Sequence, residues 1–180
     1  GVIAMLIVFQ QEIRRFLLML GNRYFSGNRI PILRLFGKQS HISKTHIEKL
    51  VKACEYLSDN YTGALIVISK TSDLRSFTGT GEILNADISE RLIQNIFYKN
   101  SPLHDGAIII AEEKIKAAGC VLPVSENPQI PDKYGLRHRA AIGMTEVSDS
   151  IVIVVSEQRG SITIARNGKI YPVTSVERLK

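Results

Sequence analysis

Two short segments combine residue types that suit chemistry on a phosphorylated substrate. The first, Ser101-Pro102-Leu103-His104-Asp105-Gly106-Ala107, lies between a predicted helix and a predicted buried strand. A carboxylate at a strand end, such as Asp105, can hold a divalent metal or take a proton from a hydroxyl group. Gly106 has no Cβ, so its backbone can approach a ligand closely. Because Asp-Gly is also a common turn dipeptide, this segment alone favours a turn over a site.

The second segment, Gly135-Leu136-Arg137-His138-Arg139-Ala140-Ala141, places three donor side chains at the start of a predicted helix. Arginine matches phosphate oxygens with a planar fork of donors, and free amide groups at a helix start bind anions. The alternative is a solvated basic helix start. Positive charge opposes the helix dipole at this end, which favours a bound anion. Together the two segments predict nucleoside triphosphate chemistry.

The rest of the sequence excludes several other classes of protein. The phosphate loops G-x-x-x-x-G-K-[ST] and G-x-G-x-x-G, the serine-hydrolase pattern G-x-S-x-G and the zinc-protease pattern H-E-x-x-H do not occur. Cys54 and Cys120 are isolated, which argues against a zinc site and predicts reduced core residues. The net charge of +6, from 23 Lys and Arg against 17 Asp and Glu, suits an anionic partner (a nucleotide, nucleic acid or a membrane surface), and the alternative is simple solubility.

Helical and strand patterns alternate along the 180 residues, which suffice for one domain. Apolar spacing predicts helices over residues 1–21, 45–57, 92–97 and 138–147, the second beginning with the capping box Thr45-His46-Ile47-Glu48. Continuous apolar runs predict strands over residues 64–68, 107–111, 115–122, 151–155, 161–165 and 169–173. Turns at 112–114 and Asn167-Gly168 predict hairpins. The expected fold is α/β: a single domain with a central mixed β-sheet flanked by helices, plus an N-terminal amphipathic helix.

The two segments at residues 101–107 and 135–141 resemble the catalytic domain of the diadenylate cyclases. Over residues 45–175 the resemblance also takes in Gly63-Ala64-Leu65-Ile66-Val67, Leu122-Pro123, Ser125-Glu126-Asn127-Pro128 and Val154-Val155-Ser156-Glu157, in the same order. Residues 7–15 resemble the membrane-anchored subfamily, in which such a helix follows transmembrane helices. We therefore expect an N-terminal helix and basic linker at 1–43, following an absent membrane anchor, and a catalytic domain at 44–180.

The resemblance implies that two ATP molecules are condensed into cyclic di-AMP with release of two pyrophosphates. It implies Mg²⁺ or Mn²⁺, with Co²⁺ as a third candidate, and a homodimer whose protomers meet face to face. The implied catalytic residues are Asp105, Arg137, His138 and Arg139, with Asp105 and His104 as metal ligands. The implied ATP-binding residues are Gly106, Ala107, Leu122, Arg137, His138, Arg139, Ser156 and Glu157.

Two positions depart from the family pattern. Leu136 replaces a common threonine, and Gln158 replaces a glutamate that is common in membrane-anchored members; both bear on the metal preference and the rate. A catalytically weak nucleotide-binding sensor module is the alternative function. Nucleic-acid binding is disfavoured because the chain has no Trp and its aromatic residues are scattered. We further expect a membrane-bound or soluble regulator, and a full-length protein on the cytoplasmic face of a bacterial membrane, while this chain itself is soluble.

Overall fold

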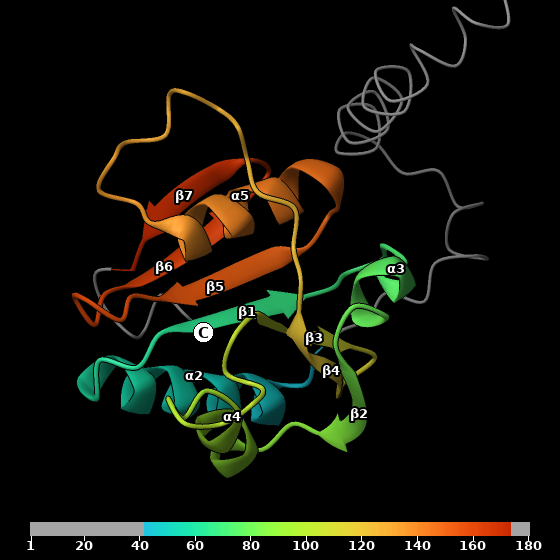
Figure 1. Cartoon of the computed structure of the whole chain (residues 1–180). Coiled ribbons are helices and arrows are strands. Elements are labelled where there is room, and N and C mark those ends of the chain that lie inside the picture. Colours follow the sequence, from blue (N-terminus) through green and yellow to red (C-terminus); the bar gives the residue numbers. More distant parts are fainter. Residues whose placement is uncertain (1–41, 174–180) are drawn as a thin grey trace, which may run out of the picture. The chain divides into compact units, whose positions relative to one another are not determined.

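A seven-stranded sheet lies at the centre of the computed structural model, which describes residues 42–173 (Figure 1). The helices are α2 (Lys44–Asp59), α3 (Arg75–Thr78), α4 (Glu90–Ile96) and α5 (Leu136–Val147). The strands are β1 (Ala64–Ile68), β2 (Glu82–Asp87), β3 (Ala107–Ala111), β4 (Lys114–Cys120), β5 (Ile151–Val155), β6 (Ile162–Arg166) and β7 (Lys169–Pro172). Helices α2 and α4 lie on one face of the sheet and α5 on the other, which confirms the expected sheet flanked by helices.

The sheet is mixed, with the strand order β2-β4-β3-β1-β5-β6-β7. Strands β1 and β3 are parallel, and each of the other neighbouring pairs is antiparallel. In the centre, Ile66 of β1 aligns with Ile108 of β3 and with Ile153 of β5. The parallel connection needs a crossover, which the segment containing α3, β2 and α4 supplies.

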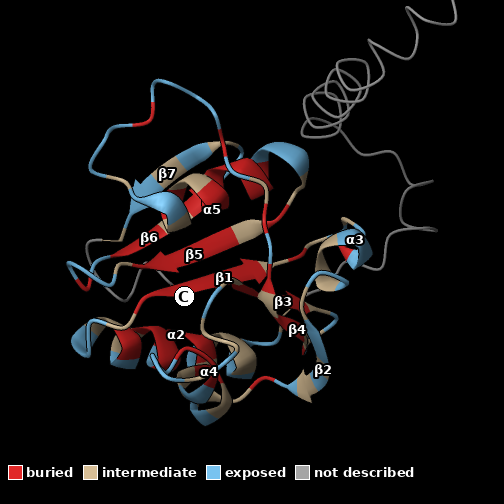
Figure 2. Ribbon diagram, viewed as in Figure 1, coloured by how far each residue is buried: buried red, intermediate tan, exposed pale blue. Residues whose placement is uncertain are grey.

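Strand β1 contributes to two hydrophobic clusters because successive side chains point to opposite faces of the sheet. Ala64 and Ile66 pack with α2 and α4, whereas Leu65 and Val67 pack with α5. Figure 2 shows the central strands as buried, with exposed residues on the outer helix surfaces. Burying one such aliphatic side chain contributes about 1.5–3 kcal/mol, so the central strands hold the two layers together.

The strands predicted at 64–68, 107–111 and 151–155 are confirmed with the predicted limits. Both predicted hairpins form: Glu112 and Glu113 have φ of 50° and 59°, and Asn167 and Gly168 have φ of 51° and 71°. Positive φ at both central residues is the requirement of a type I′ turn. At Glu112-Glu113 it is the pairing of β3 with β4, rather than the local residue types, that imposes this turn.

Several predicted helices and strands are shifted by one or two residues at their ends, and larger differences from the sequence-based expectation occur at the start of α2 and in residues 69–87. Helix α2 is capped by Ser43 rather than Thr45, because Ser43 is extended and its Oγ accepts from the His46 amide at 3.4 Å. The Ser43 amide also donates to Glu113 Oε1 at 2.7 Å, which holds this residue beside the β3–β4 turn. The polar segment 69–87, for which the sequence predicts no element, contains α3 and the edge strand β2. Strand β2 has no buried apolar run, so its pairing with β4 rather than its composition makes it a strand.

The predicted helix at 1–21 and all but the last two residues of the basic linker lie outside the described residues. The predicted boundary between residues 43 and 44 therefore stays a prediction. Across residues 42–173, no helix combines the length and the apolar character needed to cross a membrane.

Asp149, between α5 and β5, forms hydrogen bonds with Thr71 and Ser72 in the segment that follows β1. Its carboxylate accepts from the Ser72 hydroxyl at 2.7 Å, from the amides of Thr71 and Ser72 at 3.1 Å each, and from the Thr71 hydroxyl. Burial raises the pKa of this carboxyl, but the hydrogen bonds outweigh burial and hold the pKa below its ordinary value. The ionised carboxylate therefore stabilises the fold.

Replacing Asp149 by Ala should lower the free energy of unfolding by about 2–4 kcal/mol, since several charge-assisted hydrogen bonds are lost. Asp149→Asn, which keeps one acceptor oxygen, should cost less. Because the pKa is lowered on folding, this stabilisation is present above the unfolded pKa of about 3.9 and is lost as the pH falls through the folded pKa. Urea unfolding at pH 7 and pH 3 measures both effects; an unchanged stability of Asp149→Ala at pH 7 would contradict this role.

Candidate active site

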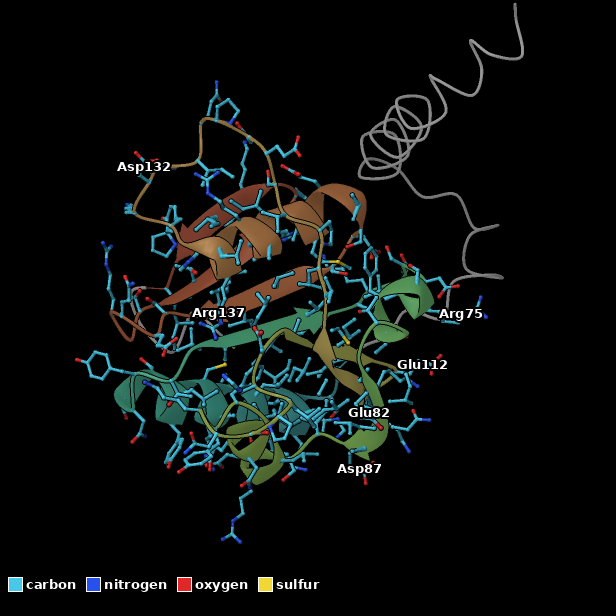
Figure 3. The ribbon with its side chains drawn as sticks, viewed as in Figure 1. Arg75, Glu82, Asp87, Glu112, Asp132 and Arg137 are labelled. Carbon is cyan, nitrogen blue, oxygen red and sulfur yellow. The ribbon has the colours of Figure 1, made fainter. Side chains whose placement is uncertain are left out.

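The sequence-predicted site residues gather at one edge of the sheet. Strands β1 and β3 begin there, after Gly63 and Gly106, and their antiparallel neighbours β5 and β4 end there. Helix α5 begins beside the same edge, and Figure 3 places Arg137 there, with Arg75 and Glu112 on the opposite side of the view. Segments that are distant in sequence therefore meet at the amino ends of the parallel strands.

A cavity of about 650 Å³ opens at this edge. That volume lies within the range of small-molecule sites in proteins. Seven of the residues predicted from the sequence line its wall: Asp105, Gly106, Leu122, Arg137, His138, Ser156 and Glu157. Both departures from the family pattern, Leu136 and Gln158, line it as well.

Three predicted residues lie elsewhere. His104 lines a neighbouring cavity of about 250 Å³ that shares Arg137 and Glu157 with the larger one. Ala107 is fully buried in β3, in the cluster beneath α5. Arg139 is half-buried on α5, outside the walls of these two cavities, and its carbonyl oxygen accepts from the Ser125 amide at 3.0 Å.

Gly106 allows the β3 and β4 backbones to meet at the cavity floor. Its φ is +106°, and a Cβ on it would lie 2.7 Å from the Gly119 carbonyl carbon and 2.8 Å from the Cys120 oxygen. A side chain at this position would therefore clash with backbone atoms. This packing gives Gly106 a structural role against β4, and the sequence-based role, close approach of its backbone to a ligand, stays a prediction.

The first turn of α5 faces the cavity with basic residues and no acidic residue of its own. Its N-cap is Gly135, which has no side chain to cap the helix, and the turn contains no acidic residue. The amides of His138 and Arg139 donate to the Gly135 carbonyl oxygen, so the preceding amides of Leu136 and Arg137 are the ones placed to donate to an anion in the cavity. Leu136 is 71% exposed at this start, where a threonine would add a hydroxyl donor.

Arg137 is held in place by a carboxylate and by a glycine. Its Nη1 donates to Glu157 Oε2 at 3.1 Å, while Glu157 Oε1 pairs with Lys99 Nζ at 3.3 Å. The hydrogen bonds from Arg137 and then Lys99 hold the pKa of Glu157 below its ordinary value. A Cβ on Gly63 would lie 2.5 Å from Arg137 Nη1. The guanidinium therefore occupies space that exists only because residue 63 is glycine.

His138 is buried at the base of the cavity. Burial, followed by the nearby charge of Arg159, lowers the pKa of this imidazole. It is therefore neutral at pH 7 and has one ring donor and one ring acceptor. The Tyr134 ring packs beside it with centroids 5.0 Å apart, and Lys133 Nζ lies 5.1 Å from the Tyr134 ring centroid.

A metal ion at this site would need ligands from the substrate. Among the residues that the structure describes, no group of three His, Cys, Asp or Glu side chains could hold a metal ion. Asp105 nevertheless presents an exposed carboxylate to the larger cavity. Mg²⁺ is commonly held by one or two carboxylates together with substrate phosphates and water, so the donor set fits such an ion.

Sequence reasoning missed several residues at the site. Lys133 and Arg159 line the cavity from loops, and Lys99 reaches Glu157 from the segment after α4. Isolated basic residues in loops have no sequence signal that separates them from solvated charges. Gly63 belongs to the segments that carry the resemblance, but its contact with Arg137 depends on tertiary packing.

The chain is similar to proteins of known family. Residues 51–170 match the family described as "DAC: DisA bacterial checkpoint controller nucleotide-binding". The "Cyclic di-AMP synthase CdaA" of Bacillus subtilis (strain 168) is 41% identical, over 100% of this chain and 64% of that protein. The chain thus spans less than two thirds of the length of the curated relatives that it matches first.

Two solved structures have the same fold. A crystal structure of a double mutant of DacA from Staphylococcus aureus matches with a TM-score of 0.73 and 41% identity, covering 75% of this chain and 90% of that one. A crystal structure of a protein from Bacillus cereus, described as a hypothetical membrane spanning protein, matches with a TM-score of 0.69 and 38% identity, covering 71% of this chain and 63% of that one.

Gly63→Ala should displace the Arg137 guanidinium and, with ATP as a triphosphate probe of the cavity, weaken its binding at least tenfold. The φ of Gly63 is not in the left-handed region, and the flexible end of Arg137 can move away, so the free energy of unfolding should change by less than about 1 kcal/mol. Calorimetric titration with ATP and urea unfolding measure the two quantities.

The control is the double-mutant cycle with Arg137→Ala. If Gly63→Ala acts through the guanidinium, the double variant should bind ATP no more weakly than Arg137→Ala alone. Additive losses would show that Gly63 acts by another route.

Proposed function

Because the chain belongs to the DAC family of diadenylate cyclases, we propose that it joins two ATP molecules into cyclic di-AMP and releases two pyrophosphates. The observation that carries the proposal is the cavity lined by both Asp105 and the Arg137-His138 helix start. The first segment alone favours a turn, and the second alone favours no more than a bound anion. Their meeting in one cavity supports a site for a metal-bound triphosphate.

We propose that the adenosine moiety occupies the apolar part of the cavity and the phosphates occupy the basic part. Leu65, Leu122 and Val154 provide apolar wall, and the Leu122 backbone would read the adenine edge. The α5 amides, Arg137 and His138 would bind the phosphates, with Ser156 as a further hydroxyl contact. Phosphoryl transfer depends mainly on such positioning and charge neutralisation.

Glu157 forms an ion pair with the Arg137 guanidinium, the group to which a phosphate would bind. Its carboxylate bridges Arg137 and Lys99, so neither cation lacks a counter-ion. A triphosphate carries more negative charge than one carboxylate, and arginine binds phosphate through two parallel hydrogen bonds. We propose that the nucleotide displaces Glu157 from Arg137.

Two facing protomers would complete the reaction. Asp105 is exposed at the cavity, where its carboxylate would accept the proton of the ribose 3′-hydroxyl that attacks the α-phosphate held by the other protomer. Arg139 lies outside the cavity walls of its own chain, a position that suits contact with the nucleotide of the second protomer. Holding two ATP molecules in line replaces a rare encounter by a local one.

A divalent ion would be held by Asp105 and phosphate oxygens. When bound, it would neutralise phosphate charge and favour ionisation of the attacking hydroxyl. His104 is the second proposed ligand: its Nδ1 lies 2.6 Å from the Ser101 carbonyl oxygen, a contact that places the proton on Nδ1 and leaves Nε2 as an acceptor. Mg²⁺ and Mn²⁺ are the first candidates and Co²⁺ the next.

We propose a place at the bacterial membrane for the full-length protein, with a membrane-bound or soluble regulator. The support is the resemblance of residues 7–15 to membrane-anchored members and the similarity to the Bacillus cereus protein, which is described as membrane spanning. Catalytic domain and anchor would then be joined by the basic residues 22–43.

Purified protein should convert ATP into cyclic di-AMP in the presence of Mg²⁺ or Mn²⁺, as measured by mass spectrometry. Because each active site needs two protomers, the rate should rise more steeply than linearly with protein concentration at low concentration. ATP binding without product under either ion would favour the sensor alternative. A strictly linear dependence down to nanomolar protein would contradict assembly of the site from separate protomers.

Asp105→Asn should reduce cyclic di-AMP formation at least 100-fold, because the amide can neither accept the proton nor hold the ion as strongly. The side chain is exposed, so the free energy of unfolding should change by about 0.5 kcal/mol or less. Glu126→Gln provides a matched control, since Glu126 is an exposed carboxylate in the loop after β4 that does not line the cavity. Turnover near that of the unmodified protein would remove Asp105 from the reaction.

A further inference from the structure

The segment after β4, Val121–Leu122, forms part of the cavity rim and is contacted by a short turn that has no role in the proposed reaction. This turn, Gly79-Thr80-Gly81, joins α3 to β2. The Thr80 Oγ1 accepts a hydrogen bond from the Val121 amide at 2.9 Å. Val121 and Leu122 both line the cavity, and Val121 is 65% exposed at its rim. One hydroxyl therefore connects the turn to the segment proposed to read adenine.

The Thr80 hydroxyl has a fixed orientation. It donates to the Phe77 carbonyl oxygen at 2.6 Å and uses a lone pair for the Val121 amide. A hydroxyl has one hydrogen and two lone pairs, so these two bonds are compatible. The donor bond directs the acceptor lone pair toward the rim, and the Val121 amide has a defined partner.

The adjacent glycine lets the turn approach β4. A Cβ on Gly81 would lie 2.3 Å from the Ala118 carbonyl oxygen and 2.8 Å from the Cys120 Sγ. Both contacts are with the last residues of β4, immediately before the rim. Only a residue without a side chain fits there, and this brings Thr80 within reach of Val121.

The turn is itself anchored in the core beneath α5. Leu74 is buried, and Phe77 packs against the same cluster, which also contains Cys120 and Leu122. On the other side, a Cβ on Gly143 of α5 would lie 2.3 Å from the Pro123 carbonyl oxygen. The rim therefore lies between α5 and the α3–β2 turn. On each side a glycine, Gly143 or Gly81, allows the backbone to approach the neighbouring segment closely.

We propose that Thr80 is a positioning residue that holds the Val121–Leu122 backbone in the geometry that recognises the nucleobase. The inference rests on the proposed binding of ATP in the cavity. Thr80 touches no substrate in this arrangement; it acts through the Val121 amide. Its loss should weaken base recognition while leaving the phosphate-binding residues in place.

Thr80→Val removes the hydroxyl with little change in shape. We expect the KM for ATP to rise about fivefold to tenfold, the effect typical of one hydrogen bond, with kcat within about twofold of its original value. The preference for ATP over GTP should fall, and Thr80→Ser should restore both quantities. Thr78→Val is the matched control: Thr78 Oγ1 donates to the Arg75 carbonyl oxygen at 3.1 Å in the same helix, away from the rim.

Hydrogen exchange of the Val121 amide, followed by NMR, tests the inference independently of activity. Exchange should accelerate in Thr80→Val and remain unchanged in Thr78→Val. A Thr80→Val variant with unaltered KM and unaltered exchange would overturn the proposal. So would an equal loss in Thr78→Val, because that would indicate general destabilisation of α3.

The two proposals fail separately. If the unmodified chain binds ATP but forms no cyclic di-AMP, the proposed activity is wrong, while calorimetric ATP affinity and Val121 exchange still test Thr80. If product forms normally and Thr80→Val matches the unmodified chain in KM, base preference and exchange, only the role of Thr80 is refuted.

Discussion

The parallel pairing of β1 with β3 is the constraint on which the site depends. It places the amino ends of both strands at one sheet edge, and so brings Gly63 beside the Asp105-Gly106 segment. The antiparallel neighbours β4 and β5 must then end where β1 and β3 begin, which delivers Leu122 and Ser156 to the same edge. The hydrophobic clusters on both faces stabilise this pairing, so the core indirectly determines the position of every catalytic candidate.

Within that framework, the charged residues at the cavity are arranged around the start of α5. The start of α5 presents amide groups and Arg137 without an acidic residue of its own, and Glu157 supplies the missing negative charge from the β5–β6 loop. Such a half-exposed ion pair contributes little to stability, so its replacement by a bound phosphate would cost little. The proposed exchange of carboxylate for phosphate would let the basic site exist without ligand and still bind one.

Glycines set how closely the backbone segments around the cavity approach. Gly63 leaves room for the Arg137 guanidinium, Gly106 allows β3 to meet β4, and Gly81 allows the α3–β2 turn to reach the end of β4. These contacts have different partners but the same physical cause, since a Cβ would occupy space filled by another group. Sequence reasoning singled out Gly106 for close approach to a ligand, because its neighbour Asp105 indicated a site, but it did not foresee the contact with β4. Gly63 and Gly81 resemble ordinary turn residues until their partners are known.

The sequence by itself determined the elements whose own residues specify them: the buried apolar strands, the Asn167-Gly168 hairpin and the basic start of α5. It also determined the family, because two short motifs occur in the right order. Only the tertiary structure decided that β2 is a strand, that Glu157 pairs with Arg137 and Lys99, and that Thr80 supports the rim. Local propensity depends on neighbours along the chain, whereas these contacts join residues that the sheet topology brings together.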